Sequence, residues 1–115
     1  MALRRWIRPD EPDWLANAHR ILDPLPPVFS TVWLSDHLQF HDEPSLGEAW
    51  TRLTYLAANF PRLRFGNLVL SQSYRNPGLL GVMAATLQRL SGGRFILGLG
   101  AGWLEEEYRA FNSKV

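Results

Sequence analysis

The chain has 115 residues, of which 46% are hydrophobic and 20% charged, a composition typical of one modest globular domain with its own core. The formal net charge is +1 and the basic residues are scattered, which argues against a nucleic-acid partner. No stretch approaches the roughly 20 apolar residues of a membrane span, and the N-terminus lacks the apolar segment of a signal peptide. Cysteine is absent, which excludes disulfides and thiolate metal sites and indicates a cytoplasmic location.

The first elements alternate between strand and helix. Leu3–Ile7 is a candidate short strand interrupted by two arginines, and an apolar stripe predicts a helix over Pro12–Ile21. The β-branched and aromatic run Ser30–Ser35 predicts a strand that leads directly into Asp36 and His37.

The next helix has a clear start and stop. Ser45 and Glu48 form a capping-box pattern, which predicts that the serine caps the helix and the glutamate bonds back to it. Apolar residues at three- and four-residue steps continue to Phe60, and Pro61 ends the helix. Leu63–Leu70 then predicts one continuous strand.

The last third of the chain repeats this order. Asn76 caps a helix predicted over Pro77–Leu90, which ends at two glycines. The apolar run Phe95–Leu97 lacks polar alternation, so we expect a strand covered on both faces. A final helix is expected over Trp103–Phe111, with Glu105–Glu107 as solvated residues favoured by the helix dipole.

The predicted strands begin about 31 residues apart, near Thr31, Leu63 and Arg94, and this is the spacing of βαβ units with parallel strands. The spacing fits a doubly wound sheet, such as a flavodoxin-like domain, as well as a (β/α) barrel. A full barrel needs about 250 residues. The chain therefore holds three or four of the eight units, and residues 1–115 are interpreted as one partial α/β domain, the N-terminal half of a (β/α)8 TIM barrel.

His37 is the candidate for proton chemistry. It follows the carboxyl end of a buried strand, where α/β proteins bind ligands, and imidazole exchanges protons near neutral pH. The alternative is a histidine that only hydrogen-bonds within a loop. His19 and His41 are interpreted as structural or solvated, and the spacing of the three histidines does not indicate a metal site.

Three glycines follow the last predicted strand, Gly98, Gly100 and Gly102. They do not form the dinucleotide fingerprint, because Trp103 occupies the place of its third glycine. Their simplest interpretation is relief of crowding at a turn from strand to helix. Motifs for nucleophilic catalysis or phosphate binding are absent from the sequence.

Taken together, the residues resemble the N-terminal part of a luciferase-like monooxygenase, a (β/α)8 family that uses FMN or the deazaflavin F420. The resemblance covers nearly everything from Thr31 onward. Its segments are Thr-Val-Trp-Leu-Ser-Asp-His at 31–37, Glu-Ala-Trp-Thr at 48–51, Arg-Leu-Arg-Phe-Gly-Asn-Leu-Val-Leu-Ser at 62–71, Tyr-Arg-Asn-Pro at 74–77, Met-Ala-Ala-Thr-Leu at 83–87, Leu-Ser-Gly-Gly-Arg-Phe-Ile-Leu-Gly-Leu-Gly-Ala-Gly-Trp at 90–103 and Glu-Tyr-Arg-Ala-Phe at 107–111.

The resemblance implies a role for each matching position. His37 would lie beside C5 of the deazaflavin and act as acid or base during hydride transfer, and Asp36 would contact the ring system. A cis peptide bond between Leu68 and Val69 would face the ring. The remaining implied cofactor contacts are the hydroxyl of Ser71 and the glycines Gly98, Gly100 and Gly102.

The resemblance also implies a function: oxidation or reduction of a small organic substrate, by hydride or oxygen chemistry. F420 is preferred slightly over FMN, because the Ser-Asp-His and Leu-Ser-Gly-Gly-Arg segments resemble F420-dependent members. Trp103 stands where some family dehydrogenases carry a glutamate, which argues against sugar-phosphate chemistry. The alternative function is a non-catalytic half-barrel that binds a partner, either another copy of the chain or a missing C-terminal half.

Overall fold

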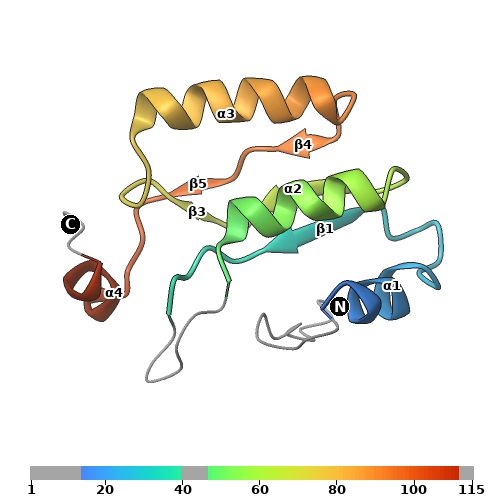
Figure 1. Cartoon of the computed structure of the whole chain (residues 1–115), viewed down its shortest axis with the longest axis horizontal. Helices are drawn as coiled ribbons and strands as arrows, with labels where there is room; N and C mark the ends of the chain where they lie inside the picture. The colour runs from blue at the N-terminus through green and yellow to red at the C-terminus, as the bar shows by residue number, and fades with distance from the viewer. Residues whose placement is uncertain (1–13, 40–46, 112–115) are drawn as a thin grey trace.

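A computed structural model describes residues 14–39 and 47–111 (Figure 1). The candidate strand Leu3–Ile7, His41 and the capping residue Ser45 lie outside the described residues. In chain order the elements are α1 (Trp14–Leu22), β1 (Thr31–Leu34), α2 (Ala49–Asn59), β2 (Arg64–Asn67), β3 (Leu70–Ser71), α3 (Pro77–Leu90), β4 (Phe95–Ile96), β5 (Leu99–Gly100) and α4 (Glu105–Ala110). No helix in these two ranges is long and apolar enough to cross a membrane.

The strands are parallel, as the repeat spacing predicted. One sheet has the order β1-β2-β4, and a second, shorter sheet pairs β3 with β5. Val32, Phe65 and Phe95 are aligned across the three strands of the first sheet. In the three-stranded sheet a helix lies between each strand and the next along the chain, which is the βαβ connection that is right-handed in nearly all known sheets.

The strand predicted over Leu63–Leu70 is interrupted. β2 ends at Asn67 and β3 begins at Leu70, and the peptide bond between Leu68 and Val69 is cis, as the resemblance implied. The following strand has a matching break between β4 and β5. Ser71, one residue beyond the predicted strand, is the last residue of β3. The interruption carries the chain from the three-stranded sheet into the two-stranded one.

The N-cap of α2 differs from the prediction, whereas the N-cap of α3 is the predicted one. Glu48 is itself the N-cap of α2, where its carboxylate accepts hydrogen bonds from the amides of Trp50 (2.9 Å) and Thr51 (2.7 Å). The capping-box prediction was therefore wrong about Glu48, because the helix begins only one residue after it. Asn76 caps α3 as predicted, accepting from the amides of Gly78 (2.9 Å) and Leu79 (3.1 Å).

The core lies on one face of the sheet. In Figure 1 α2 crosses in front of the strands and α3 runs beside β4. Phe65 and Phe95 are buried against this helical layer, and the ring of Trp50 meets that of Phe95 edge to face at 5.2 Å. The helices thus supply the apolar cover for this face of the sheet.

The opposite face, which we call the open face, consists of Trp33, Gly66 and Ile96, aligned across β1, β2 and β4. Trp33 remains 45% exposed, and Leu97, the residue after β4, is also exposed. The prediction that Phe95–Leu97 is covered on both faces was therefore wrong, because the described residues contribute no second layer here. In a closed barrel this face would line the interior.

Candidate functional site

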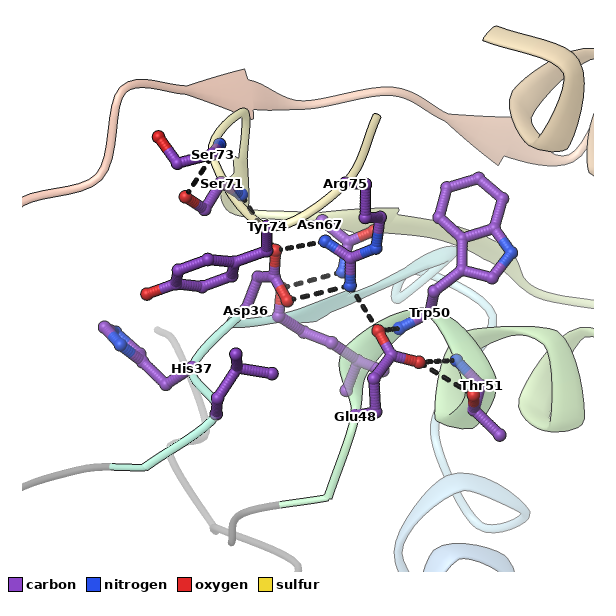
Figure 2. Close-up of polar contacts among 12 residues, drawn as sticks. Asp36, His37, Glu48, Trp50, Thr51, Asn67, Ser71, Ser73, Tyr74 and Arg75 are labelled. Atoms are coloured by element: carbon purple, nitrogen blue, oxygen red, sulfur yellow. Dashed lines mark hydrogen bonds and ion pairs between the residues drawn. The ribbon is translucent and has the colours of Figure 1, made fainter. Parts of the chain in front are cut away.

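The candidate site lies at the carboxyl ends of the strands. Asp36 and His37 follow β1, Ser71 ends β3, and Tyr74 and Arg75 stand in the loop before α3. Figure 2 shows the guanidinium of Arg75 between the carboxylates of Asp36 and Glu48, with the rings of Tyr74 and His37 on the other side of Asp36. This is the edge of a parallel sheet at which α/β proteins bind ligands.

Asp36 connects the segments at this edge through hydrogen bonds. Its buried carboxylate accepts a forked pair of hydrogen bonds from Arg75, Nη1 to Oδ2 at 2.7 Å and Nη2 to Oδ1 at 3.1 Å. The amide of Ser71 donates to Oδ2 at 2.8 Å (Figure 2). The resemblance implied that Asp36 contacts a cofactor ring; here both carboxylate oxygens already accept bonds within the chain.

Arg75 also pairs with Glu48, so one guanidinium bridges two carboxylates. Burial by itself lowers the pKa of Arg75. The hydrogen bonds and negative charges of Asp36 and Glu48 have a larger, opposite effect, so the pKa of Arg75 is raised above its ordinary value. Burial likewise raises the pKa of Glu48, yet the bonds from Thr51 and Trp50 and the contact with Arg75 bring it below the ordinary value. Arg75 and Glu48 are therefore both charged at neutral pH.

His37 is held by a carboxylate from the far end of the chain. Its Nδ1 lies 2.8 Å from Oε2 of Glu107, in the first turn of α4, and the side chains are 17% and 1% exposed. The hydroxyl of Tyr74 donates to the same oxygen at 2.7 Å. The other oxygen, Oε1, accepts from the amides of Leu38 at 2.6 Å and Gln39 at 3.1 Å.

The prediction that Glu105–Glu107 are all solvated was wrong for Glu107. Consecutive helical residues project about 100° apart, so three adjacent glutamates spread over more than half of the helix circumference and need not all face solvent. Glu105 is exposed and pairs with Arg109 at 2.5 Å, while Glu107 faces the strand ends. The run of three acids at a helix start was therefore the signal that sequence reasoning missed.

The donors around Glu107 keep it charged. Burial raises its pKa, but the bonds from His37, Tyr74, Gln39 and Leu38 outweigh that effect and the pKa lies below its ordinary value. For Tyr74, burial and then the neighbouring Glu107 raise the pKa of the phenol. An ionised carboxylate thus faces a protonated tyrosine and an imidazole.

The three glycines are required by the protein's own packing. A Cβ at Gly98 would overlap the carbonyl oxygen of Asn67, and one at Gly100 would overlap the side chain of Val69. Gly102 has a φ of +83°, and a Cβ there would overlap the hydroxyl of Tyr108. The crowding interpretation therefore accounts for all three positions. A cofactor contact by their backbone remains a prediction.

The other predicted contact residues lie around the same edge. Leu68 and Val69 are exposed, whereas Ser71 is buried and its hydroxyl accepts from the amide of Ser73 at 3.4 Å. Trp103, largely exposed, lies edge-on to the ring of His37 with a centroid distance of 6.0 Å. The structure thus brings His37 and Trp103 together, which sequence reasoning did not foresee.

The remaining described histidine is remote from this edge. His19 lies on α1, where its Nδ1 is 2.9 Å from the carboxylate of Asp23 one turn later. Within residues 14–39 and 47–111 no group of three or more histidines and acids is arranged to hold a metal ion.

Parallel β/α repeats with an imidazole at the carboxyl ends place the chain among the barrel-type α/β proteins. The sequence model of the luciferase-like monooxygenase family matches residues 28–114. The chain belongs to this family, whose fold is a TIM barrel.

Individual relatives support the same family assignment. The chain is 35% identical over 74 residues to a 5,10-methylenetetrahydromethanopterin reductase of Methanolobus tindarius, covering 64% of this chain and 21% of the relative. It is 39% identical over 77 residues to an F420-dependent glucose-6-phosphate dehydrogenase of Microbacterium testaceum, covering 64% and 23%. The crystal structure of the monooxygenase RslO1 from Streptomyces bottropensis aligns with a TM-score of 0.65 and 28% identity, covering 75% of this chain and 26% of that one.

These matches define a family of oxidoreductases. The chain spans about a quarter of the length of each relative. It corresponds to one part of the barrel that the complete relatives form.

Proposed function

We propose that this chain forms the histidine side of an F420 or flavin site in an oxidoreductase that acts on a small organic substrate. The observation that carries the proposal is His37 at the carboxyl end of β1, held by the buried Glu107. A family relative named as F420-dependent supports F420 over FMN. Trp103 stands where some family dehydrogenases carry a glutamate, which argues against the sugar phosphate of that relative as the substrate.

The residues at this edge fit a flat ring system. Leu68, Val69 and Leu99 are exposed apolar side chains on adjoining segments, and they offer a surface for an aromatic face. His37 adds a polar group that can exchange a proton. When bound, a deazaflavin or flavin supplies or accepts the hydride; the chain supplies the surface and the proton.

The proposed role of His37 is general acid or base. Hydride transfer changes the protonation of the cofactor or the substrate, and a neighbouring imidazole can take up or return that proton near neutral pH. The side chain is 17% exposed, so it is held in place but remains accessible at the strand ends.

Titration with F420 and with FMN, followed by absorbance and fluorescence, tests the proposal. We expect F420 to bind more tightly than FMN. In an assembly that turns over, His37→Asn should lower the rate about 100-fold or more, as for loss of a general acid or base, without abolishing cofactor binding. His19→Asn is the matched control, because His19 is remote on α1. The proposal is wrong if neither cofactor binds at micromolar concentration.

The second candidate function is assembly with a second copy of the chain. Among the described residues β1 and β4 each pair on one side only, and their unpaired edges belong to strands of the same direction. β1 of one copy can therefore extend the parallel order beyond β4 of another, which would cover both edges.

A further inference from the structure

The interaction between Glu107 and His37 determines more than the position of the ring. We infer that Glu107 is a positioning residue that holds His37 as the tautomer protonated at Nδ1, so that Nε2 is the nitrogen that exchanges the proton at the site. The inference rests on the proposed function for the use of that proton, but the tautomer itself is a property of the chain.

The first argument is the donor count at Glu107. An ionised carboxylate only accepts hydrogen bonds, and its two oxygens offer about four positions. The amides of Leu38 and Gln39 take two at Oε1, and the hydroxyl of Tyr74 takes one at Oε2. The remaining contact is Nδ1 of His37 at 2.8 Å. Nδ1 must therefore carry a proton and donate it.

The second argument is burial. Glu107 is 1% exposed, so water cannot replace a missing donor without cost, and a buried charge needs its partners. The four donors come from the segment after β1 and from the loop before α3, while the acceptor comes from α4. One carboxylate thus fixes both the backbone beside His37 and the ring itself.

The third argument concerns the neutral ring. A neutral imidazole has one protonated nitrogen, and its lone pair lies on the other. With Nδ1 donating to Glu107, that lone pair lies on Nε2. The same carboxylate stabilises the doubly protonated ring once Nε2 gains a proton, as carboxylates that orient catalytic histidines do.

Two-bond ¹H–¹⁵N correlation spectra of the ¹⁵N-labelled chain test the inference directly. At a pH where His37 is neutral, we expect the pattern of an imidazole protonated at Nδ1. A neutral ring protonated at Nε2 in the unmodified chain would overturn the inference. The measurement needs neither cofactor nor substrate, so failure to bind F420 would count against the proposed function alone.

The variant Glu107→Gln sharpens the test. Its amide has one accepting oxygen and one donating NH₂ group. The backbone amides of Leu38 and Gln39 can only donate, so the oxygen must face them and the NH₂ group must face His37 and Tyr74. Nδ1 would then have to accept, and we expect the tautomer to switch to Nε2–H.

Two control variants separate this effect from a structural one. Glu105→Gln changes an exposed glutamate on the same helix and should leave the His37 pattern unchanged. Tyr74→Phe removes one donor but keeps the carboxylate, so Nδ1–H should persist. If folded Glu107→Gln keeps His37 protonated at Nδ1, Glu107 does not select the tautomer. If that variant fails to fold, the spectrum of the unmodified chain still tests the inference, because a ring protonated at Nε2 there would overturn it.

Discussion

At the level of single residues, the site holds two buried carboxylates that are stabilised in different ways. Asp36 lies in the fork of Arg75, an ionic contact with two parallel hydrogen bonds. Glu107 is stabilised instead by four hydrogen-bond donors, none of which is an arginine. The arginine fork suits a fixed structural link between the strand ends. The donor set around Glu107 suits a group that responds to the protonation of its neighbour.

We predict that acid destabilises the chain partly through Glu107. Its pKa is below the ordinary value of 4.5 in the folded chain, so between the two values the unfolded chain binds more protons. The contribution of Glu107 is present above about pH 4.5 and is lost as the pH falls through the folded pKa. Urea denaturation of the chain at neutral and acidic pH measures this loss.

Glu107→Gln tests the assignment of that pH dependence. Replacing the carboxylate should lower the free energy of unfolding at neutral pH by about 1–3 kcal/mol, because buried donors lose their charged acceptor. The loss of stability below pH 4.5 should then be shallower than in the unmodified chain, with the part due to Glu48 remaining. Equal slopes in both chains would contradict the assignment. Glu105→Gln serves as the exposed control.

At the level of secondary structure, the interrupted strands require glycines at the points where they approach each other. β2 and β4 give way to β3 and β5 through matching interruptions, and there Gly98 and Gly100 face Asn67 and Val69 at distances that exclude a side chain. The glycines allow the two interrupted segments to remain hydrogen-bonded, with the Leu70 amide donating to the Gly98 carbonyl at 2.7 Å.

We expect opposite effects from alanine at two glycines. Gly98→Ala should lower the free energy of unfolding by about 1–3 kcal/mol, because its Cβ would overlap the backbone of Asn67. Gly81→Ala should raise it by up to about 1 kcal/mol, because Gly81 lies in α3 with open space around its Cβ position. Urea midpoints of the two variants measure both effects. Similar midpoints would show that movement of the chain relieves the crowding at Gly98.

The elements themselves were largely predictable. Asn76 followed by Pro77 marked the start of α3, and the spacing of Thr31, Leu63 and Arg94 indicated parallel strands. The start of α2 was misassigned because Glu48 can act either as a cap or as the last member of a capping box. The break within Leu63–Leu70 came from the family resemblance, since the local apolar pattern is that of an uninterrupted strand.

At the level of the whole molecule, the helices that the structure describes cover one face of the sheet only. Trp33 stays half exposed, and the edges of β1 and β4 are unpaired among the described residues. Unpaired edges with apolar side chains recruit further strands. This arrangement is what one part of a barrel presents before the remaining strands close around it.

We predict that the chain by itself self-associates through the edge formed by β4 and β5. Leu99→Lys places a charge on this edge and should shift the chain towards monomer, because an edge lysine opposes strand addition. Size-exclusion chromatography with light scattering over a range of concentrations measures the shift. Val28→Lys is the control, an exposed apolar residue outside the strands. A monomeric unmodified chain at every concentration would contradict the prediction.

The sequence alone determined the class of fold and the position of His37, because strand spacing, caps and apolar periodicity are local properties. It also determined that His37 follows a strand end, where barrel proteins bind ligands. Only the tertiary structure decided what surrounds that histidine. Glu107 is 70 residues away from it, and no local pattern reveals which of three adjacent glutamates turns inward. The pairing of Asp36 with Arg75 was decided in the same way, by the meeting of strand ends in space.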